Sequence, residues 1–195
     1  MLLLGTSNIN KVLEFTRLLK EIDLCGLRDI GCDIEVDETG VSYAENAAIK
    51  ASAYAHETGR WVLSDDTGLE VEALGGAPGI MSARFAGTNS TGSENVTKLM
   101  ADLQGEKQRQ ATFHCALALA NAKGEVVLTS CGMLGGRILE EPAGEGGFTY
   151  DYVFFEEKSG CTLAEMPTYA VDRLSHRAKA VREIKNDLLR LLKED

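Results

Sequence analysis

Hydrophobic residues follow two periodicities along this chain, and each predicts a different kind of element. The run Met1 to Leu4 is uninterrupted and predicts a short buried strand at the start. Hydrophobic residues then recur at helical spacing, which predicts a first helix capped by Asn8 or Asn10. The recurring positions are Val12, Phe15, Leu18, Leu19 and Ile22. The chain therefore opens as strand, loop and helix.

Further along, helical and strand patterns succeed one another without strict alternation. Residues 43–56 carry a stripe of alanines that suits close approach to a sheet, and residues 91–103 show helical spacing. Residues 111–120 are almost continuously apolar, and a turn at 121–124 leads into 125–130, which predicts an antiparallel hairpin. Apolar residues between positions 181 and 192 mark one face of a last helix. This succession predicts an α/β fold with a mixed sheet rather than a regular doubly wound one.

A hydrophobic run, Trp61 to Leu63, leads directly into Ser64-Asp65-Asp66-Thr67. The pattern predicts a buried strand that ends in adjacent carboxylates at the rim of a sheet, where a hard cation and a phosphorylated ligand could meet. The alternative is that Asp65 and Asp66 only open a turn, because aspartate bonds to nearby backbone amides. Both readings stay open on this segment alone.

Composition narrows the class of protein. With 195 residues and 44% hydrophobic content, the chain is long enough for one domain with an inserted lobe. A formal charge of −10 argues against broad binding to nucleic acid or to an anionic membrane, so a polyanionic ligand would need local cations or a metal ion. Five cysteines without a C-x-x-C pair, and a start without a basic leader, favour a cytoplasmic protein with reduced thiols, most of them in the core.

The segment from Gly5 to Lys11 lies between the first predicted strand and helix. Free backbone amides and the positive end of a helix attract phosphate there, and Lys11 adds a point charge. The segment is not a P-loop, because the G-x-x-x-x-G-K-[ST] pattern is absent. A capped helix start with a surface lysine is the structural alternative.

Taken together, the motifs resemble one known family. In order they are Thr6-Ser7-Asn8 with Lys11, Glu38-Thr39-Gly40, Glu45-Asn46-Ala47 with Lys50, Ser64-Asp65-Asp66-Thr67-Gly68-Leu69, Gly75-Gly76-Ala77-Pro78-Gly79, Ser82-Ala83-Arg84, Glu141-Pro142, Gly146-Gly147-Phe148-Thr149-Tyr150-Asp151 and Ser175-His176-Arg177. The chain is similar over nearly its full length to the inosine triphosphate pyrophosphatase family, also called Ham1 or RdgB-like.

This resemblance implies a fold and an activity. The expected fold is α/β, with a long central mixed β-sheet flanked by helices, residues 1–195 forming a single domain of two lobes with a cleft between them, and a homodimer. The expected reaction is Mg²⁺-dependent hydrolysis of non-canonical purine nucleoside triphosphates (ITP, dITP, XTP) to the monophosphate and pyrophosphate, which cleans the nucleotide pool.

The resemblance also assigns roles to residues. Glu38 and Asp66 match the metal positions, with Asp65 as a possible further ligand, and Asp66 matches the proton acceptor that orients or deprotonates the attacking water. Lys11 and Lys50 would neutralise the triphosphate. The positions that match substrate contacts are Thr6, Ser7, Asn8, Ile9, Asn10, Lys11, Lys50, Thr67, Phe148, Thr149, Tyr150, Asp151, Val171, His176 and Arg177.

Three positions depart from the family pattern. Ser7 and Thr149 stand where relatives usually have glycine, and Val171 stands where they commonly have lysine. We expect Arg173 to replace that lysine in part if the segment is a loop, and to be unable to do so in a continuous helix. Two other functions stay open: a Maf-like house-cleaning pyrophosphatase with another base preference, and a nucleotide-binding module that has lost turnover.

Overall fold

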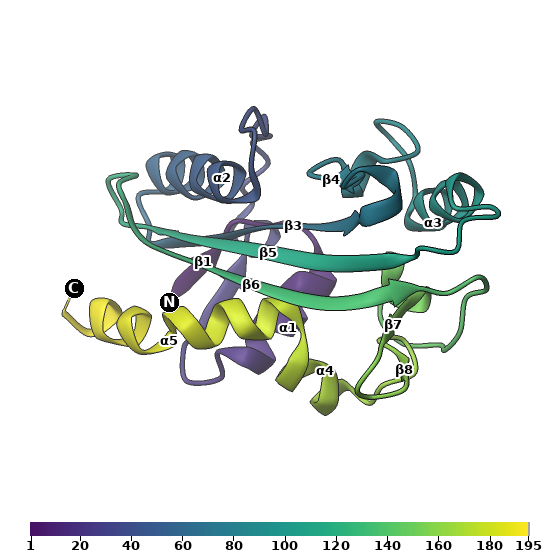
Figure 1. Cartoon of the computed structure of the whole chain (residues 1–195). Coiled ribbons are helices and arrows are strands. Elements are labelled where there is room, and N and C mark those ends of the chain that lie inside the picture. Colours follow the sequence, from purple (N-terminus) through teal and green to yellow (C-terminus); the bar gives the residue numbers. More distant parts are fainter. Residues whose placement is uncertain (195) are drawn as a thin grey trace. The chain divides into compact units, whose positions relative to one another are not determined.

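A computed structural model describes residues 1–194 and shows a mixed α/β fold (Figure 1). The helices are α1 (Ile9–Leu18), α2 (Tyr43–Thr58), α3 (Gly92–Asp102), α4 (Thr168–Leu174) and α5 (His176–Glu194). The strands are β1 (Leu2–Leu4), β2 (Leu24–Gly26), β3 (Val62–Val71), β4 (Pro78–Gly79), β5 (Gln110–Ala120), β6 (Val126–Ile138), β7 (Phe154–Glu156) and β8 (Cys161–Thr162). Short 3₁₀ turns cover residues 27–30, 72–74, 82–84 and 149–152.

The strands form one mixed sheet in the order β2-β1-β3-β5-β6-β7-β8, with β4 paired to β3. β1 pairs in parallel with β2 and β3, whereas β6, β7 and β8 pair antiparallel. The predicted fold, a mixed sheet flanked by helices, is therefore confirmed. Contacts divide the chain into a first unit (residues 1–66, 115–132 and 176–195) and a second unit (67–114 and 133–175). The arrangement of two lobes with a cleft stays a prediction.

In the first unit, strand alternation sends neighbouring side chains to two separate cores. Leu2 and Leu4 of β1 pack with α1 and α5, whereas Leu3 between them packs with α2. β5 repeats the pattern, because residues 115, 117 and 119 join the first core and 116, 118 and 120 join the second. Accordingly, α2 covers one face of these strands and α1 and α5 cover the other (Figure 1).

The first helix is shorter than its hydrophobic pattern. Asn8 is its cap, since the side chain accepts a hydrogen bond from the backbone N–H of Asn10. The helix ends at Leu18, yet Leu19 and Ile22 still contact the core from the following turn. Apolar spacing shows which residues face the core and not where helical hydrogen bonding stops. The apolar pattern therefore extends beyond the end of the helix.

The start of α2 is built by a capping arrangement that also anchors the preceding loop. Ser42 accepts from the N–H of Glu45, and the Glu45 carboxylate accepts from the N–H of Val41 at 2.7 Å. Gly40 lies so close to the first turn that an added Cβ would stand 2.6 Å from Glu45 Cβ and 2.7 Å from Asn46 Oδ1. Only glycine fits this position, which fixes the loop carrying Glu38 against α2.

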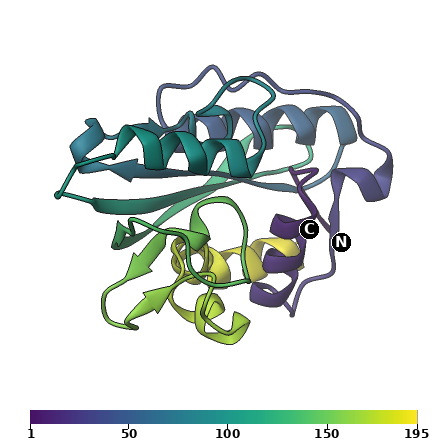
Figure 2. The same cartoon turned by 90° about the vertical axis from the view of Figure 1, so that its right-hand side faces the viewer.

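The second unit has its own apolar core, which includes residues of β3, β5, β6, β7 and α3. Thr91 and Glu94 form a capping box at the start of α3. The buried Tyr150 donates its hydroxyl to the carbonyl of Ser82 at 2.9 Å, which ties the 149–152 turn to the 82–84 turn. Figure 2 turns this unit toward the viewer, with α3 above the strands and β7 and β8 below them.

The cysteines and the helix lengths settle two smaller points. All five cysteines are free: Cys25 and Cys115 are buried, Cys32 and Cys161 are partly buried and pack against apolar cores, and Cys131 is exposed, so four of the five lie in or against a core. Within residues 1–194, no helix is both long enough and apolar enough to cross a membrane.

Candidate active site

The adjacent carboxylates Asp65 and Asp66 lie within β3 and not at its end. The strand runs on to Val71, because the residues after the pair, Leu69 and Val71, are fully buried and continue the ladder. Neighbouring side chains on a strand point to opposite faces, so the two carboxylates enter different surroundings. Both are buried, at 3% and 7% exposure, and each therefore needs partners of its own.

Asp66 faces α2 and the loop before it. Lys50 Nζ lies 3.2 Å from Asp66 Oδ1 and 2.6 Å from Glu38 Oε1, so a single ammonium group holds both predicted metal ligands. Asn46 Nδ2 donates to the other carboxylate oxygen, Asp66 Oδ2, at 3.2 Å. Asn46 and Lys50 are four residues apart and share one face of α2, which places both against β3.

The charges at this cluster influence one another. Burial raises the pKa of Asp66, Lys50 works against that rise, and the nearby Glu38 adds to it. Burial also opposes the charge on Lys50, but the carboxylates around it, that of Asp66 first, outweigh burial and raise the lysine pKa. One ammonium therefore faces two carboxylates, and a net negative charge remains at the cluster.

Asp65 faces α1 and α5 on the opposite side of β3. Its Oδ2 lies 2.8 Å from Lys11 Nζ and 3.6 Å from Arg177 Nη2. Burial alone would raise the pKa of this carboxyl, but the cations, Lys11 first and Arg177 next, hold it well below the ordinary value. Asp65 is thus a charged partner of two cations, and its orientation does not support the further metal-ligand role suggested by its sequence position.

Arg177 has a second carboxylate partner that the sequence did not single out. Its Nη1 donates to Glu14 Oε2 at 2.5 Å, and its guanidinium lies 5.8 Å from the centre of the Phe15 ring. Arg177 and Glu14 are 2% and 6% exposed, so this ion pair is buried. Glu14 stands three residues after Lys11 on α1, a helical spacing that could have indicated that both face the same partner.

The first turn of α5 approaches β6 at a glycine. A Cβ on Gly132 would lie 2.1 Å from the carbonyl oxygen of His176 and 2.5 Å from the backbone nitrogen of Ala180. The absence of a side chain there lets the helix start, with His176 and Arg177, lie directly on the strand. Both residues are buried, and the prediction that they stand at the beginning of the last helix is confirmed.

The predicted phosphate loop is also the cap of α1. Thr6 Oγ1 accepts from the N–H of Asn8, and Asn8 Oδ1 accepts from the N–H of Asn10. Ser7 and Ile9 are exposed, whereas Lys11 is partly buried because it reaches Asp65. The capped helix start is therefore present, and the anion site at the same segment stays a prediction.

The remaining predicted substrate contacts belong to the second unit. Thr67 follows Asp66 in β3, and residues 148–151 form the turn in which Asp151 Oδ2 accepts from the N–H of Phe148 at 2.9 Å. Burial raises the pKa of Tyr150, whose hydroxyl bonds to Ser82. Thr149 has a φ of 50°, a left-handed conformation that a β-branched residue rarely adopts.

Val171 and Arg173 lie in a continuous helix, α4. Val171 packs against the apolar core of the second unit, whereas Arg173 is exposed. Residues two apart on a helix face different directions, so Arg173 does not take the position of the lysine that Val171 replaces. The condition for a replacement by Arg173, a loop at this segment, is therefore not met, as expected for a continuous helix.

The donor set at Asp66 fits Mg²⁺. This ion takes oxygen ligands, keeps several waters and is commonly held by one or two carboxylates together with substrate phosphates. Glu38 and Asp66 already approach one cation, the Lys50 ammonium, and the cluster keeps a negative charge. Within residues 1–194, no group of three or more His, Cys, Asp or Glu side chains could hold a metal ion.

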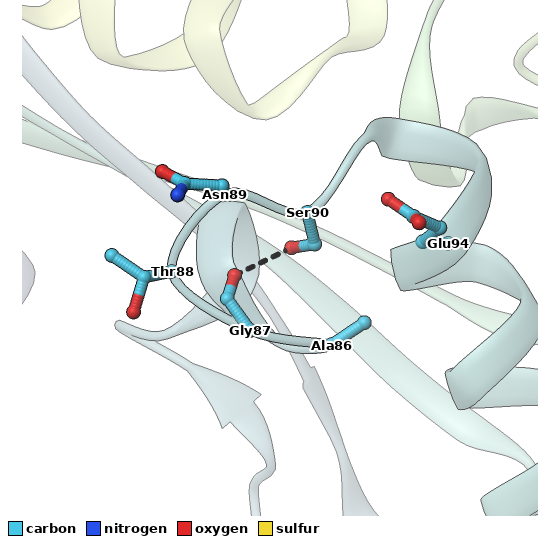
Figure 3. Close-up of a pocket in the computed structure, with 6 residues that line it drawn as sticks. All are labelled: Ala86, Gly87, Thr88, Asn89, Ser90 and Glu94. Atoms are coloured by element: carbon cyan, nitrogen blue, oxygen red, sulfur yellow. Dashed lines mark hydrogen bonds between the residues drawn. The ribbon is translucent and has the colours of Figure 1, made fainter.

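A polar surface hollow lies elsewhere in the second unit, formed by residues 86–90 and Glu94 (Figure 3). Within the loop, Ser90 donates its hydroxyl to the carbonyl of Gly87 at 2.8 Å. The lining contains none of the predicted site residues.

Comparison with known proteins places this arrangement in a family. The Ham1 family model matches residues 2–187. A dITP/XTP pyrophosphatase of Prochlorococcus marinus is 43% identical and the match covers 98% of this chain and 94% of the relative. A dITP/XTP pyrophosphatase of Bacillus licheniformis is 41% identical, with 93% and 94% covered.

Solved structures agree with the sequence comparison. The Ham1 protein of Staphylococcus aureus superimposes with a TM-score of 0.85 at 33% identity, covering 96% of this chain and 97% of the other. A HAM1 protein of Coxiella burnetii gives a TM-score of 0.86 at 34% identity, with 97% and 98% covered. Because sequence and fold both match over nearly the whole length, this chain belongs to the Ham1 family.

Proposed function

We infer that this chain is a dITP/XTP pyrophosphatase, an enzyme that hydrolyses non-canonical purine nucleoside triphosphates to the monophosphate and pyrophosphate. The observation that carries the inference is the buried Asp66, which shares the Lys50 ammonium with Glu38. Full-length similarity to proteins named for this activity supports it. In the reaction, water adds to a phosphorus of the α–β phosphoanhydride bond and pyrophosphate leaves.

Asp66 is the proposed catalytic residue. Its carboxylate orients the attacking water and accepts a proton from it, a role for which general-base catalysis supplies roughly 10²- to 10⁴-fold in rate. Burial raises the pKa of this carboxyl, whereas Lys50 and a bound cation act in the opposite direction, so the position of Asp66 toward the water matters more than its basicity. Glu38 and Asp66 would hold Mg²⁺, and the ion, when bound, supplies charge for the developing negative oxygens.

Two lysines, together with the metal ion held at the net-negative cluster, would supply the positive charge that a chain of net charge −10 needs beside a polyanion. Lys50 and Lys11 would move part of their contact from Asp66 and Asp65 to the phosphates of the substrate. Thr6, Ser7, Asn8, Ile9 and Asn10 would offer polar groups at the positive end of α1 to the same phosphates.

Base selection is proposed for one set of residues in the first unit and another set in the second. His176 and Arg177 at the start of α5 are donors that suit a 6-keto purine, whereas a 6-amino group would set donor against donor. In the second unit, Phe148 could stack on a base, and Thr67, Thr149, Tyr150, Asp151 and Val171 complete the proposed contacts.

One observation favours a second candidate function. Val171 replaces the usual lysine and Arg173 does not take over its place, so a nucleotide-binding protein with reduced or lost turnover is the alternative. A Maf-like base preference is the other alternative. The proposed assembly is a homodimer. The proposed location is the cytoplasm, where cysteines stay reduced, and all five cysteines of this chain are free.

The proposal is tested by a panel of dITP, XTP, ITP, ATP and GTP with Mg²⁺, in which pyrophosphate and single phosphate are measured separately. Pyrophosphate from the first three, with ATP and GTP much slower, is the expected result. Binding of ITP without product would instead support the non-catalytic module, and preference for other bases would support the Maf-like reading.

A further inference from the structure

Asn46 is a buried side chain that joins the two parts of the proposed metal site. It is 2% exposed and stands in the first turn of α2. Its Nδ2 donates to Asp66 Oδ2 at 3.2 Å, and its Oδ1 accepts from the backbone N–H of Gly40 at 2.9 Å. Gly40 lies two residues after Glu38, so one amide spans from one carboxylate to the loop that carries the other.

Among residues 1–194, Asp66 has hydrogen bonds from two side chains, Asn46 and Lys50, and these two partners differ in charge and in what else they bind. Lys50 is shared between two carboxylates and, in the proposed function, also turns to the substrate phosphates. Asn46 carries no charge, and its orientation is fixed because exchanging its oxygen and nitrogen would set donor against donor at Gly40. It therefore keeps hold of Asp66 Oδ2 while the lysine changes partners.

We propose that Asn46 is the positioning residue for Asp66 and the Glu38 loop in this enzyme. The idea rests on the proposed function, in which Asp66 is metal ligand and proton acceptor. Asn46 contacts neither water nor substrate in this account, and it acts by fixing the plane of the carboxylate and the distance to the loop. Partners that orient a metal-binding side chain in this way are worth roughly 10- to 100-fold in metal affinity or activity.

The chain offers a matched control in Asn95, which is also 2% exposed. Asn95 accepts from the N–H of Ala86 and donates to the carbonyl of Ala83, so it also bridges a loop to a helix. It lies in the second unit and is assigned no part in binding or catalysis. A purely structural effect of losing a buried amide should therefore appear equally in both positions.

The experiment compares Asn46→Ala and Asn46→Asp with Asn95→Ala. Steady-state kinetics with dITP and saturating Mg²⁺ gives kcat and KM, and binding of Mn²⁺ to the nucleotide-free protein is measured by titration calorimetry. Asn46→Ala should lower kcat by about 10- to 100-fold with KM within about twofold, and weaken Mn²⁺ binding about tenfold. Asn95→Ala should lower the melting temperature yet leave kcat and Mn²⁺ binding within about twofold of the parent.

Asn46→Asp separates the two contacts of the amide. The aspartate can still accept from Gly40, but it sets an oxygen against Asp66 Oδ2, so kcat should fall at least as far as in Asn46→Ala. If Asn46→Ala does not fold, Asn46→Asp still allows the proposal to be tested. Values of kcat and Mn²⁺ affinity within twofold of the parent in both variants, or equal losses in Asn95→Ala, would overturn the proposal.

The Mn²⁺ arm separates this inference from the proposed function. If the parent protein releases no pyrophosphate from any triphosphate, the proposed function fails. Weaker Mn²⁺ binding in Asn46→Ala and not in Asn95→Ala would still support the positioning role, whereas unchanged binding would refute it.

Discussion

At the scale of single residues, the informative result is that two adjacent aspartates have opposite electrostatic surroundings. Asp65 meets the cations of Lys11 and Arg177, and its pKa is held low, whereas burial raises the pKa of Asp66. Strand alternation alone produces this division, because it sends the two side chains to different faces of β3. One carboxylate thereby contributes to the fold and the other is available for chemistry.

The lowered pKa of Asp65 predicts a pH-dependent stability. Its charge stabilises the folded state above the ordinary aspartate value of about 3.9, and this contribution disappears as pH falls through the lower folded value. Asp65→Asn should cost about 3 kcal/mol near neutral pH, since removing one member of a buried ion cluster leaves its partners uncompensated. Urea unfolding should show the gap between parent and variant constant above about pH 5 and shrinking below about pH 4. A gap that does not depend on pH would contradict this.

Thr149 carries backbone strain that a glycine would release. Its φ of 50° is unfavourable for residues with a Cβ by roughly 1 kcal/mol or more. Thr149→Gly should therefore be more stable than Thr149→Ala by about 1 kcal/mol, despite the entropy that glycine loses on folding. Chemical unfolding of the two variants is the measurement, and Thr149→Ala serves as the control that keeps the Cβ. Equal midpoints would show that the turn holds no such strain.

Sequence motifs singled out three residues that the structure brings together. Glu38, Lys50 and Asp66 come together although 28 positions of sequence separate the first from the last. The motif Glu45-Asn46-Ala47 contains Asn46 but assigns it no role, and no motif contains Glu14, because a neutral amide and a helical glutamate look ordinary until their partners are known. Only helical spacing indicated which way these side chains face. Asn46 stands four residues before Lys50, and Glu14 stands three residues after Lys11.

At the scale of elements, hydrophobic patterns predicted which helices and strands exist better than they predicted where each one ends. Helices α1, α2, α3 and α5 and the β5–β6 hairpin appear where expected, whereas α4 was not predicted. In addition, α1 stops before its pattern does, and β3 runs through the acidic pair. The strand was expected to end at the acidic pair, but it continues because buried partners allow carboxylates within a strand. Such partners come from α1, α2 and α5, which local sequence does not reveal.

The continuity of α4 predicts the kinetic effect of Arg173. Because this side chain and Val171 face different directions, Arg173→Ala should leave the KM for dITP or XTP within about twofold of the parent. Michaelis constants for both proteins decide the point. A KM that rises tenfold would mean that Arg173 does bind substrate, contrary to its place on the helix.

The pairing of α1 with α5 depends on the buried contact between Glu14 and Arg177. Glu14→Ala should reduce the free energy of unfolding by about 3 kcal/mol, because a buried arginine loses one of its carboxylates. The matched control is Asp102→Asn, which removes an exposed i,i+4 partner of Lys98 and should change stability by less than about 0.5 kcal/mol. Equal changes in the free energy of unfolding for the two variants, measured in urea, would contradict the larger contribution expected of the buried Glu14–Arg177 pair.

At the scale of the whole molecule, an acidic chain is proposed to bind a polyanion. Local charge resolves this conflict, since Lys11, Lys50 and Arg177 all lie against carboxylates of β3 in a chain of net charge −10. These ion pairs hold the three cations beside β3, and the protein does not need a broad basic surface to present them. Family membership and a mixed sheet were predictable from the order of motifs, whereas the division of contacts into two units came from the structure.

The central claim is that Asp66 performs the chemistry, and the direct measurement is kcat for pyrophosphate release from dITP by Asp66→Asn at saturating Mg²⁺. Asparagine keeps the shape of the side chain but cannot accept the proton, so a loss of roughly 10²- to 10⁴-fold is predicted while the variant stays folded. Turnover by Asp66→Asn within a few fold of the parent would contradict the account.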